Sequence, residues 1–296
     1  MLKFRAVSVQ DFEKVEDILT KSNIKNCEYC YPTLLVWSHR HPSELAIEED
    51  TLFVRSEGHE HMWYLFPKGK MEPEKAINLI LEDAKSHGLP ISIYGIDKED
   101  ASIIEEKFQG KLELEVDRDG ADYIYTQEDL ANLPGKNYQK KRNHVSRFLR
   151  EHPDYKFVEI TDENKDKARK YVDTWCTKYE HDDDWDFISE KRGINELLDN
   201  FDRLKLSGAM IEVDDEVVAM TVAAPINDEM VDIMIEKAYH EMNGAYAIIN
   251  RDFARNCLSK FKYINREDDL GLENLRKAKL SYFPCEILEK YTARGI

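Results

Sequence analysis

Apolar residues recur along the chain at two spacings, and each spacing predicts a different kind of element. Three or four residues apart, they predict amphipathic helices over residues 10–22 and 73–87, and Gly88 ends the second helix. Short apolar runs separated by acidic and glycine turn residues predict three antiparallel strands between residues 45 and 66. In the rest of the first half, the pattern predicts a helix over residues 97–108. It also predicts strands over 91–94, 112–116 and 121–125.

The second half of the chain repeats this order of elements with little repetition of sequence. The same spacings predict helices over 163–179, 188–202, 244–260 and 272–280, and strands over 208–213, 216–224, 230–236, 263–265 and 286–291. The GNAT-type N-acyltransferase fold has this order of elements: helices, three antiparallel strands, a helix, a strand, a helix and a strand. We therefore predict an α/β (α+β) protein with a tandem GNAT-like fold, in which each lobe has a mixed, mostly antiparallel sheet flanked by helices.

We place the first lobe at residues 1–130 and the second at residues 131–296, with a basic joint helix over 134–151. Two lobes suit a chain of 296 residues, because domains cluster near about 100 to 150 residues. Two unrelated α+β domains that share a common order of elements are the alternative.

The composition indicates a cytoplasmic globular protein. Hydrophobic residues make up 42% and charged residues 34%, and no window approaches the ~20 apolar residues of a membrane span. The first residues run directly into an acidic helix and lack the apolar centre of a secretory signal. The 5 cysteines are an odd number, which favours free thiols in a reducing compartment. We expect a cytoplasmic protein with no transmembrane segment and no structural disulfide.

The charge is distributed unevenly along the chain. The formal net charge of −17 argues against a DNA-binding protein, because affinity for phosphates comes mainly from Lys and Arg. Residues 136–150 are the exception, since they hold six basic residues and no acid and leave −23 on the rest of the chain. On a helix, Lys136, Lys140 and Arg147 fall on one face, which favours a phosphate-bearing partner such as charged tRNA. A solvated helix surface is the alternative.

Motifs at the joint and near the C-terminus resemble those of a known family. They lie at residues 122–125, 140–144, 236–238, 244–246, 265–271 and 275–284. In the last of these, Lys279, Tyr282 and Pro284 occupy the places of a Phe-Lys-x-x-aromatic-x-Pro element. The chain thus resembles the bacterial proteins grouped with the phosphatidylglycerol lysyltransferase C-terminal (catalytic) domain, within the GNAT and Fem-type acyltransferase superfamily. The resemblance implies transfer of an aminoacyl group from charged tRNA, or of an acyl group from coenzyme A as in the wider superfamily.

Acyl transfer to an amine requires an anchored donor, a polarised carbonyl, a base and a proton donor for the leaving group. Asn243, Gly244, Ala245 and Tyr246 lie between a predicted strand and a predicted helix, where backbone N–H groups and the helix dipole favour an anion. We predict that they bind the pyrophosphate of coenzyme A or of an acyl-CoA co-substrate; an ordinary turn is the alternative. Tyr282 is the predicted proton donor, as a tyrosine often is in GNAT enzymes, and a core aromatic is its alternative.

Glu236 is the candidate base. Residues 231–236 alternate, so Asp232 and Glu236 are predicted to share one face of a strand while Ile233 and Ile235 point to the other. We expect crowding by Asp232 and partial burial to raise the pKa of Glu236 toward neutrality. Exposed acids on a sheet face are the alternative.

Other polar residues are candidates for substrate binding. Asn265, Glu267 and Asp268 lie at a predicted strand end, where they would suit a cationic or amine substrate, although a solvated turn fits them equally. Arg276 and Lys279 are three residues apart on one predicted helix and could hold a phosphate or carboxylate. On the joint helix, the substrate-binding candidates are Lys140, Lys141, Arg142 and Asn143.

We predict no metal site. The C-x-x-C spacing at residues 27–30 has no second pair, and the polar clusters at 59–61 and 181–184 lack further ligands. The sequence contains no phosphate-binding loop, dinucleotide fingerprint or nucleophile elbow. These absences argue against a nucleotide hydrolase, a dinucleotide-dependent oxidoreductase and a hydrolase of the nucleophile-elbow type.

The first functional hypothesis is therefore an acyltransferase that moves an acyl or aminoacyl group from a CoA-type donor to a small-molecule amine, by direct attack in a ternary complex. The second is an aminoacyl-tRNA-dependent transferase whose basic joint helix binds the tRNA. The third is a non-catalytic ligand- or protein-binding module on a degenerate transferase fold.

Overall fold

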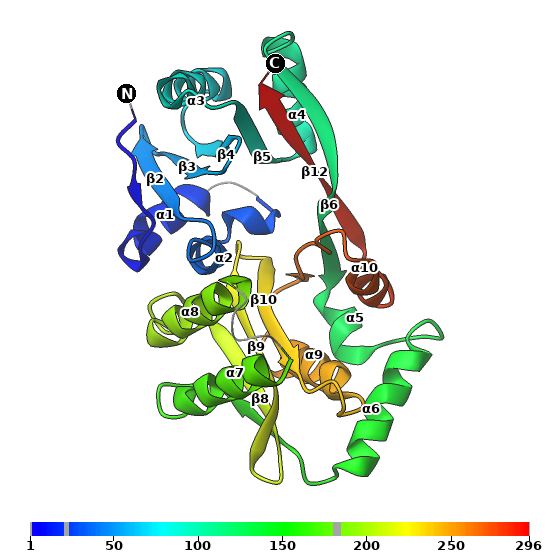
Figure 1. The fold of residues 1–296 in the computed structure, drawn as a ribbon. Coiled ribbons are helices and arrows are strands. Elements are labelled where there is room, and N and C mark those ends of the chain that lie inside the picture. Colours follow the sequence, from blue (N-terminus) through cyan, green and yellow to red (C-terminus); the bar gives the residue numbers. More distant parts are fainter. Residues whose placement is uncertain (1, 21–23, 180–184, 296) are drawn as a thin grey trace.

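The two halves of the chain form two lobes that share one mixed β-sheet (Figure 1). The computed structural model describes residues 2–20, 24–179 and 185–295. These residues form a 12-stranded sheet with the order β1-β2-β3-β4-β5-β12-β6-β11-β10-β9-β8-β7. Strands β1 to β5 lie at one end of this order and β7 to β11 at the other, with β12 and β6 between them. The prediction of mixed, mostly antiparallel strands flanked by helices is confirmed, and the two lobes share a single sheet where one sheet per lobe was expected.

The first lobe contains the meander that the apolar pattern predicts. Its elements are β1 (Arg5–Ala6), α1 (Phe12–Leu19), α2 (Tyr31–Trp37), β2 (Ser43–Glu48), β3 (Thr51–Glu57), β4 (Met62–Gly69), α3 (Pro73–His87), β5 (Ile91–Ile96) and α4 (Lys98–Lys107). Strands β2, β3 and β4 pair in antiparallel fashion, and β5 then pairs with β4 in parallel. Sequence reasoning missed α2, because its seven residues are mostly aromatic or β-branched and include a proline.

The second lobe repeats this arrangement. Its elements are α5 (Gln127–Asn132), α6 (Gln139–Glu151), β7 (Lys156–Glu159), α7 (Lys165–Tyr179), α8 (Trp185–Asp199), β8 (Ser207–Val213), β9 (Glu216–Pro225), β10 (Met230–Ala238), α9 (Ala245–Asn256), β11 (Tyr263–Asn265) and α10 (Glu273–Leu280). Strands β8, β9 and β10 form the second meander, and β11 joins β10 in parallel. Helices α7 and α8 cover one face of this part of the sheet, and α9 covers the other (Figure 1).

Two long strands form the centre of the sheet, β6 (Leu112–Thr126) and β12 (Glu286–Gly295). The prediction of separate strands at 112–116 and 121–125 was wrong, because β6 continues through an irregularity at which the Gly120 N–H donates to the Asp117 side chain at 2.9 Å. Strand β12 comes from the end of the chain but pairs with β5 as well as β6. The lobe ranges 1–130 and 131–296 stay a prediction, and β6 and β12 join the lobes along one side (Figure 1).

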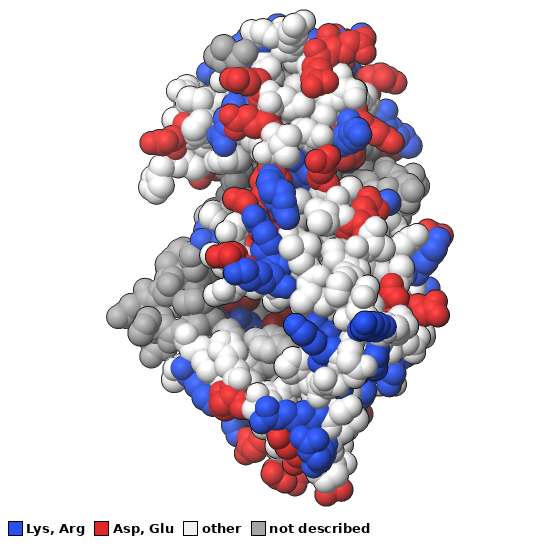
Figure 2. Space-filling model, turned by 90° about the vertical axis from the view of Figure 1, so that its right-hand side faces the viewer, with Lys and Arg blue, Asp and Glu red and all other residues white. Residues whose placement is uncertain are grey.

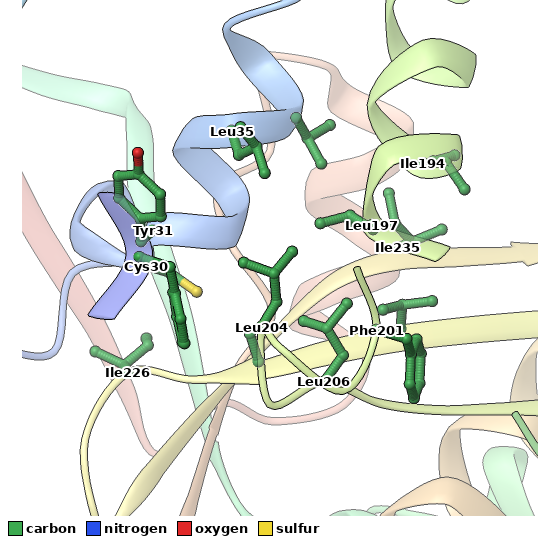
Figure 3. Packing of buried hydrophobic residues seen from close by; sticks show 14 of the residues in the cluster. Cys30, Tyr31, Leu35, Ile194, Leu197, Phe201, Leu204, Leu206, Ile226 and Ile235 are labelled. Carbon is green, nitrogen blue, oxygen red and sulfur yellow. The ribbon is translucent and has the colours of Figure 1, made fainter. Parts of the chain in front are cut away.

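A hydrophobic core crosses the boundary between the lobes. Leu35 and Val36 of α2 belong to one buried cluster with Ile194 and Leu197 of α8 (Figure 3). The two helices approach closely at Gly193, where a Cβ would lie 2.9 Å from the carbonyl oxygen of Val36. Two further clusters lie within the lobes, one beneath α3 and α4 and the other beneath α9. Buried packing therefore joins the two lobes in addition to the shared sheet.

Candidate functional site

The second lobe opens where β10 separates from β11. Strand β10 pairs with β9 over residues 231–238, but it pairs with β11 through Met230, Val231 and Asp232. Strand β11 ends at Asn265, so the edge of β10 from Ile233 onward runs past the end of its neighbour. The backbone groups of this edge are not used by β11, which makes the opening a natural place for a ligand.

A β-bulge in β10 overturns the prediction that Asp232 and Glu236 share a face. Ile233 pairs with Ala223 and Ile235 with Val222, so the strand carries an additional residue at this point and the alternation of side chains reverses. Ile235 accordingly joins the core between the lobes, while Ile233 joins the core beneath α9. Asp232 faces α2 and Glu236 faces α9, so Asp232 does not crowd Glu236 as the sequence suggested.

Glu236 has a guanidinium partner at the opening. Arg266, the residue that follows β11, donates from Nη2 to Glu236 Oε1 at 2.7 Å, and Asn250 of α9 donates from Nδ2 to Oε2 at 3.1 Å. The Glu236 and Arg266 side chains are only 11% and 13% exposed. Sequence reasoning missed Arg266 and Asn250 as site residues. The available signals were an arginine within an acidic run and an asparagine on the buried face of a helix.

Lys141 and Tyr282 complete this group. We call Glu236, Asn250, Arg266, Lys141 and Tyr282 the Arg266 cluster. The Lys141 ammonium lies 3.7 Å from the centre of the Tyr282 ring, and the Arg266 guanidinium lies 4.9 Å from it. Burial, reinforced by the charge of Arg266, lowers the pKa of Lys141 to about 8. Burial raises the pKa of Tyr282, so its phenol stays protonated at neutral pH. The tertiary structure thus brings together three residues that the sequence singled out separately.

Two buried polar atoms of the Arg266 cluster, Arg266 Nη1 and Asn250 Oδ1, have no hydrogen-bond partner among the described residues. Such atoms are rare in proteins, since each costs roughly 1–3 kcal/mol when it is left unpaired. Arg266 Nη1 can donate to an oxygen that develops negative charge, and Asn250 Oδ1 can accept from an amine. With a carboxylate and a lysine of lowered pKa beside them, the cluster has the kinds of group that acyl transfer requires.

Helix α6 lies against the residues that were predicted to bind a pyrophosphate. Gly244 has a φ of +88°, and a Cβ at this position would lie 2.5 Å from the carbonyl oxygen of His144 in α6. The close approach of α6 is thus a structural reason for a glycine here, and that side of Gly244 is already occupied. Of the neighbouring candidates, Asn243 is exposed, Ala245 is buried and Tyr246 is 37% exposed. Coenzyme A binding at these residues stays a prediction, which the packing of α6 disfavours.

A second group of charged residues lies between the lobes, with Asp122 and Asp232 fully buried at its centre. We call Glu28, Asp122, Asp232, Glu267 and Asp268 the interlobe acidic cluster. Lys290 Nζ lies 2.7 Å from Asp122 Oδ1, and Thr33 donates to Asp232 Oδ2 at 2.8 Å. Burial raises the pKa of Asp232 to about 8 and raises that of Glu267 well above its ordinary value. Asp232 Oδ1 and Glu267 Oε1 have no partner in the part of the chain that the structure describes.

The candidates Asn265, Glu267 and Asp268 therefore lie with this cluster and not on a solvated turn. Asn265 is fully buried and donates from Nδ2 to Asp122 Oδ2 at 2.8 Å. Burial raises the pKa of Asp268 as well. Access of a cationic substrate to these residues stays a prediction.

Arg276 and Lys279 lie on α10 but contact different groups. Arg276 donates from Nε and Nη2 to the two carboxylate oxygens of Asp269, each at 2.8 Å. Lys279 is buried, its Nζ donates to the carbonyl oxygen of Arg266, and burial lowers its pKa. The two side chains do not converge on one anion, so their predicted shared role has no support from this geometry.

The basic residues of the joint segment divide into an exposed and an internal set. Lys136, Lys140, Arg147 and Arg150 are exposed. Arg142 donates to the carbonyl oxygen of Gly135 at 2.6 Å, and Asn143 accepts from Gln139 at 2.8 Å, so both residues have partners within this segment. Lys141 alone of the four predicted contacts reaches the Arg266 cluster. Figure 2 views the side that carries α6 and α10, and it shows Lys and Arg gathered around a hollow in the lower half of the molecule.

Other features of the described residues bear on the remaining predictions. Within the described ranges, no group of three or more His, Cys, Asp and Glu is arranged to hold a metal ion, and residues 181–184 lie outside those ranges. Cys27 and Cys30 are buried free thiols. No helix in the described part of the chain has the length and apolar character needed to cross a bilayer.

Comparison with known proteins agrees with the resemblance seen in the motifs. A family model described as phosphatidylglycerol lysyltransferase, C-terminal, matches residues 20–294. An uncharacterised protein of Mycoplasmoides gallisepticum is 26% identical over 196 residues, which is 64% of this chain. The match spans 62% of that relative, less than two thirds of its length.

Solved structures share the fold over nearly the whole chain. A conserved protein of unknown function from Bacteroides thetaiotaomicron is 34% identical, with a TM-score of 0.93 over 100% of both chains. The C-terminal domain of a putative lysylphosphatidylglycerol synthetase from Agrobacterium fabrum is 12% identical, with a TM-score of 0.71 over 97% of this chain and 92% of that one. A tandem GNAT protein from the clavulanic acid biosynthesis pathway is 9% identical, with a TM-score of 0.53 over 100% and 98%. The predicted tandem GNAT-like fold is confirmed.

Proposed function

The chain belongs to the family of phosphatidylglycerol lysyltransferase C-terminal domains, and from this premise we propose that it moves an aminoacyl group from a charged tRNA to an amine acceptor. One observation carries the proposal. Helix α6 exposes basic residues to solvent and also directs Lys141 into the Arg266 cluster, 3.7 Å from the ring of Tyr282. A polyanion bound along α6 would have its acyl end within reach of groups suited to acyl transfer.

Of the two donors that the sequence leaves open, coenzyme A and charged tRNA, this proposal adopts charged tRNA. Helix α6 packs against Gly244 where the pyrophosphate of coenzyme A would have to approach the backbone. An RNA donor needs no such site, because its phosphates can be neutralised by exposed Lys and Arg. The geometry therefore supports a tRNA donor better than a CoA-type donor.

In the proposed mechanism, the neutral acceptor amine attacks the carbonyl carbon of the aminoacyl ester in a ternary complex. The Glu236 carboxylate takes the proton that the attacking nitrogen loses, and Arg266 Nη1 donates a hydrogen bond to the developing oxyanion. The bond between the carbonyl carbon and the ribose oxygen then breaks, and Lys141 gives its proton to that oxygen. Tyr282 holds the ammonium of Lys141 against its ring. An amide and a free ribose hydroxyl are the products.

Lys141 provides a test of the mechanism through pH. Because its pKa is about 8, Lys141 is protonated below this pH and neutral above it. The proton donor is thus lost as pH rises, and kcat/KM should fall through pH 8. Lys141→Arg keeps the positive charge but cannot give up a proton, so kcat should drop roughly 10²- to 10⁴-fold and the limb near pH 8 should vanish. The measurement is transfer of a radiolabelled amino acid from charged tRNA to a panel of amines. Identical pH profiles for the two proteins would exclude this role of Lys141.

Salt dependence provides a test of the donor. If the four exposed basic residues contact phosphates, tRNA affinity should fall roughly 10²-fold between 50 and 200 mM salt, as fluorescence anisotropy can measure. Charge reversal at Lys136, Lys140 and Arg150 should abolish binding. The matched control reverses three lysines of the first lobe, Lys75, Lys85 and Lys98, and should leave binding largely unchanged.

The same preparation separates the competing hypotheses. A flat salt response, or an equal loss in the two charge-reversed proteins, would argue against a tRNA donor. A saturable rise of the melting temperature with acyl-CoA would support the hypothesis of a CoA-type donor. Tight ligand binding without any turnover would favour the binding module.

A further inference from the structure

Three aromatic rings form a stacked row in the second lobe. Tyr179 is the last residue of α7, His240 follows β10, and Tyr246 lies in the first turn of α9. The ring centres of Tyr179 and His240 are 4.3 Å apart at an interplanar angle of 30°, and those of His240 and Tyr246 are 6.2 Å apart at 29°. We call these residues the aromatic row. Nearly parallel rings in succession offer a surface on which another flat ring can stack.

The aromatic row is held in place by its surroundings although it is open to solvent. The Tyr179 hydroxyl accepts a hydrogen bond from the backbone N–H of His240 at 3.0 Å. The ring centres of Trp175 and His240 are 6.0 Å apart in a T-shaped arrangement, and Trp175 donates from Nε1 to the carbonyl oxygen of Ala238 at 3.1 Å. His240 and Tyr246 are nevertheless exposed. Rigid aromatic side chains that face solvent together are typical of a binding surface.

One end of the aromatic row, Tyr246, lies close to the two regions that the proposed function assigns to the donor. Tyr246 lies one turn before Asn250 on α9, so the two side chains share a face of the helix, and Asn250 contacts Glu236 of the Arg266 cluster. On the other side, Gly244 is two residues from Tyr246 and packs against His144 of α6. The Tyr246 end of the aromatic row is therefore close both to α6 and to the Arg266 cluster.

We propose that the aromatic row binds the terminal nucleobase of an RNA donor by stacking, so that the ester on the same nucleoside reaches the Arg266 cluster. This inference rests on the proposed function and adds to it a separate site for the base. Single-stranded RNA is commonly held by bases that stack on aromatic side chains, and such stacking tolerates any base because each has a flat π face. Helix α6 would hold the phosphates and the Arg266 cluster the ester.

The probe for this site is an uncharged RNA hairpin with a single-stranded ACCA 3′ end, compared with the same hairpin whose last residue is abasic. Fluorescence anisotropy with the intact chain measures both dissociation constants. The wild type should prefer the complete end about 5- to 150-fold, since stacking of one base contributes ~1–3 kcal/mol. Tyr246→Ala and His240→Ala should each remove most of this preference. Tyr246→Phe keeps the ring and should retain it.

The two probes distinguish failure of this inference from failure of the proposed function. Equal affinity of the wild type for both hairpins would overturn the role of the aromatic row, while a loss of binding on charge reversal in α6 would still support the RNA donor. Absence of binding to either hairpin at 50 mM salt would contradict both. The comparison of probes on the wild type needs no variant, so misfolding of Tyr246→Ala could not obscure the result.

Discussion

The carboxyl group of Asp232 is fully buried. One of its oxygens accepts a hydrogen bond, and the other has no hydrogen-bond partner within the described residues. Thr33 donates to Oδ2 at 2.8 Å, and burial, with the nearby Asp122 charge opposing ionisation, raises the pKa to about 8. The same group has a pKa near 3.9 in an unfolded chain. Between about pH 4 and pH 8 the folded protein holds a proton that the unfolded chain has lost, so the contribution of Asp232 to stability falls as pH rises.

Asp232→Asn tests this conclusion, because the amide is neutral at every pH and its oxygen can still accept from Thr33. The free energy of unfolding should exceed that of the wild type by about 1–3 kcal/mol at pH 8 and by less at pH 5. Urea unfolding at both pH values measures the difference. Asp232→Ala is the control, since it leaves Thr33 unpaired and a cavity, and it should destabilise at both. If the difference in the free energy of unfolding between Asp232→Asn and the wild type stays constant with pH, Asp232 does not titrate in this range.

Among the elements, α2 and α8 illustrate how one residue sets the distance between two helices. A Cβ at Gly193 of α8 would lie 2.8 Å from Cγ1 of Val36, and 2.9 Å from both its Cα and its carbonyl oxygen. Two of these three atoms belong to the backbone, so no change of rotamer can relieve the contact. The interlobe core around Leu35 and Leu197 depends on this close approach.

Gly193→Ala should therefore lower the free energy of unfolding by about 1–3 kcal/mol through overpacking. Helix propensity alone predicts the opposite sign, because alanine favours a helix over glycine by about 1 kcal/mol. The midpoint of urea unfolding decides between them. Adding Val36→Ala should not restore stability, since the backbone contacts persist. A Gly193→Ala protein more stable than the wild type would contradict the close approach of α2 and α8.

For the molecule as a whole, the continuous sheet and the core between the lobes predict that both lobes unfold together. Strand β12 lies between β5 and β6 at the centre of the sheet, although it is the last element of the chain. Strand β1 lies at the edge and contains two residues. The loss of stability on removal of a strand should depend on the position of that strand in the sheet, and not on its position in the sequence.

Deletion of residues 286–296 should therefore unfold both lobes, whereas deletion of residues 1–6 should lower stability but leave the protein folded. Circular dichroism and urea unfolding measure both, and the intact chain should show one cooperative transition. Two separate transitions in the intact chain would contradict this account, as would a folded second lobe after loss of β12.

Much of the fold could be predicted from local sequence patterns. The spacing of apolar residues located α3 at the bounds observed and both antiparallel meanders, because an element that buries one face must repeat apolar residues at its own period. Strand β6 appeared as two strands because Gly120 and its polar neighbours read as a break. Lys141, Glu236 and Tyr282 could be named as candidates from residue type and motif alone.

The sequence by itself thus determined most of the order of elements, together with the tandem GNAT-like fold and the family of this protein. Only the tertiary structure decided that Glu236 meets Arg266 and Asn250 while Asp232 turns to Thr33, because a bulge in β10 reverses the alternation that the sequence suggests. It likewise decided that α6 covers Gly244. Such contacts join residues far apart in the chain, and their geometry depends on how whole elements pack, which no local pattern of residues specifies.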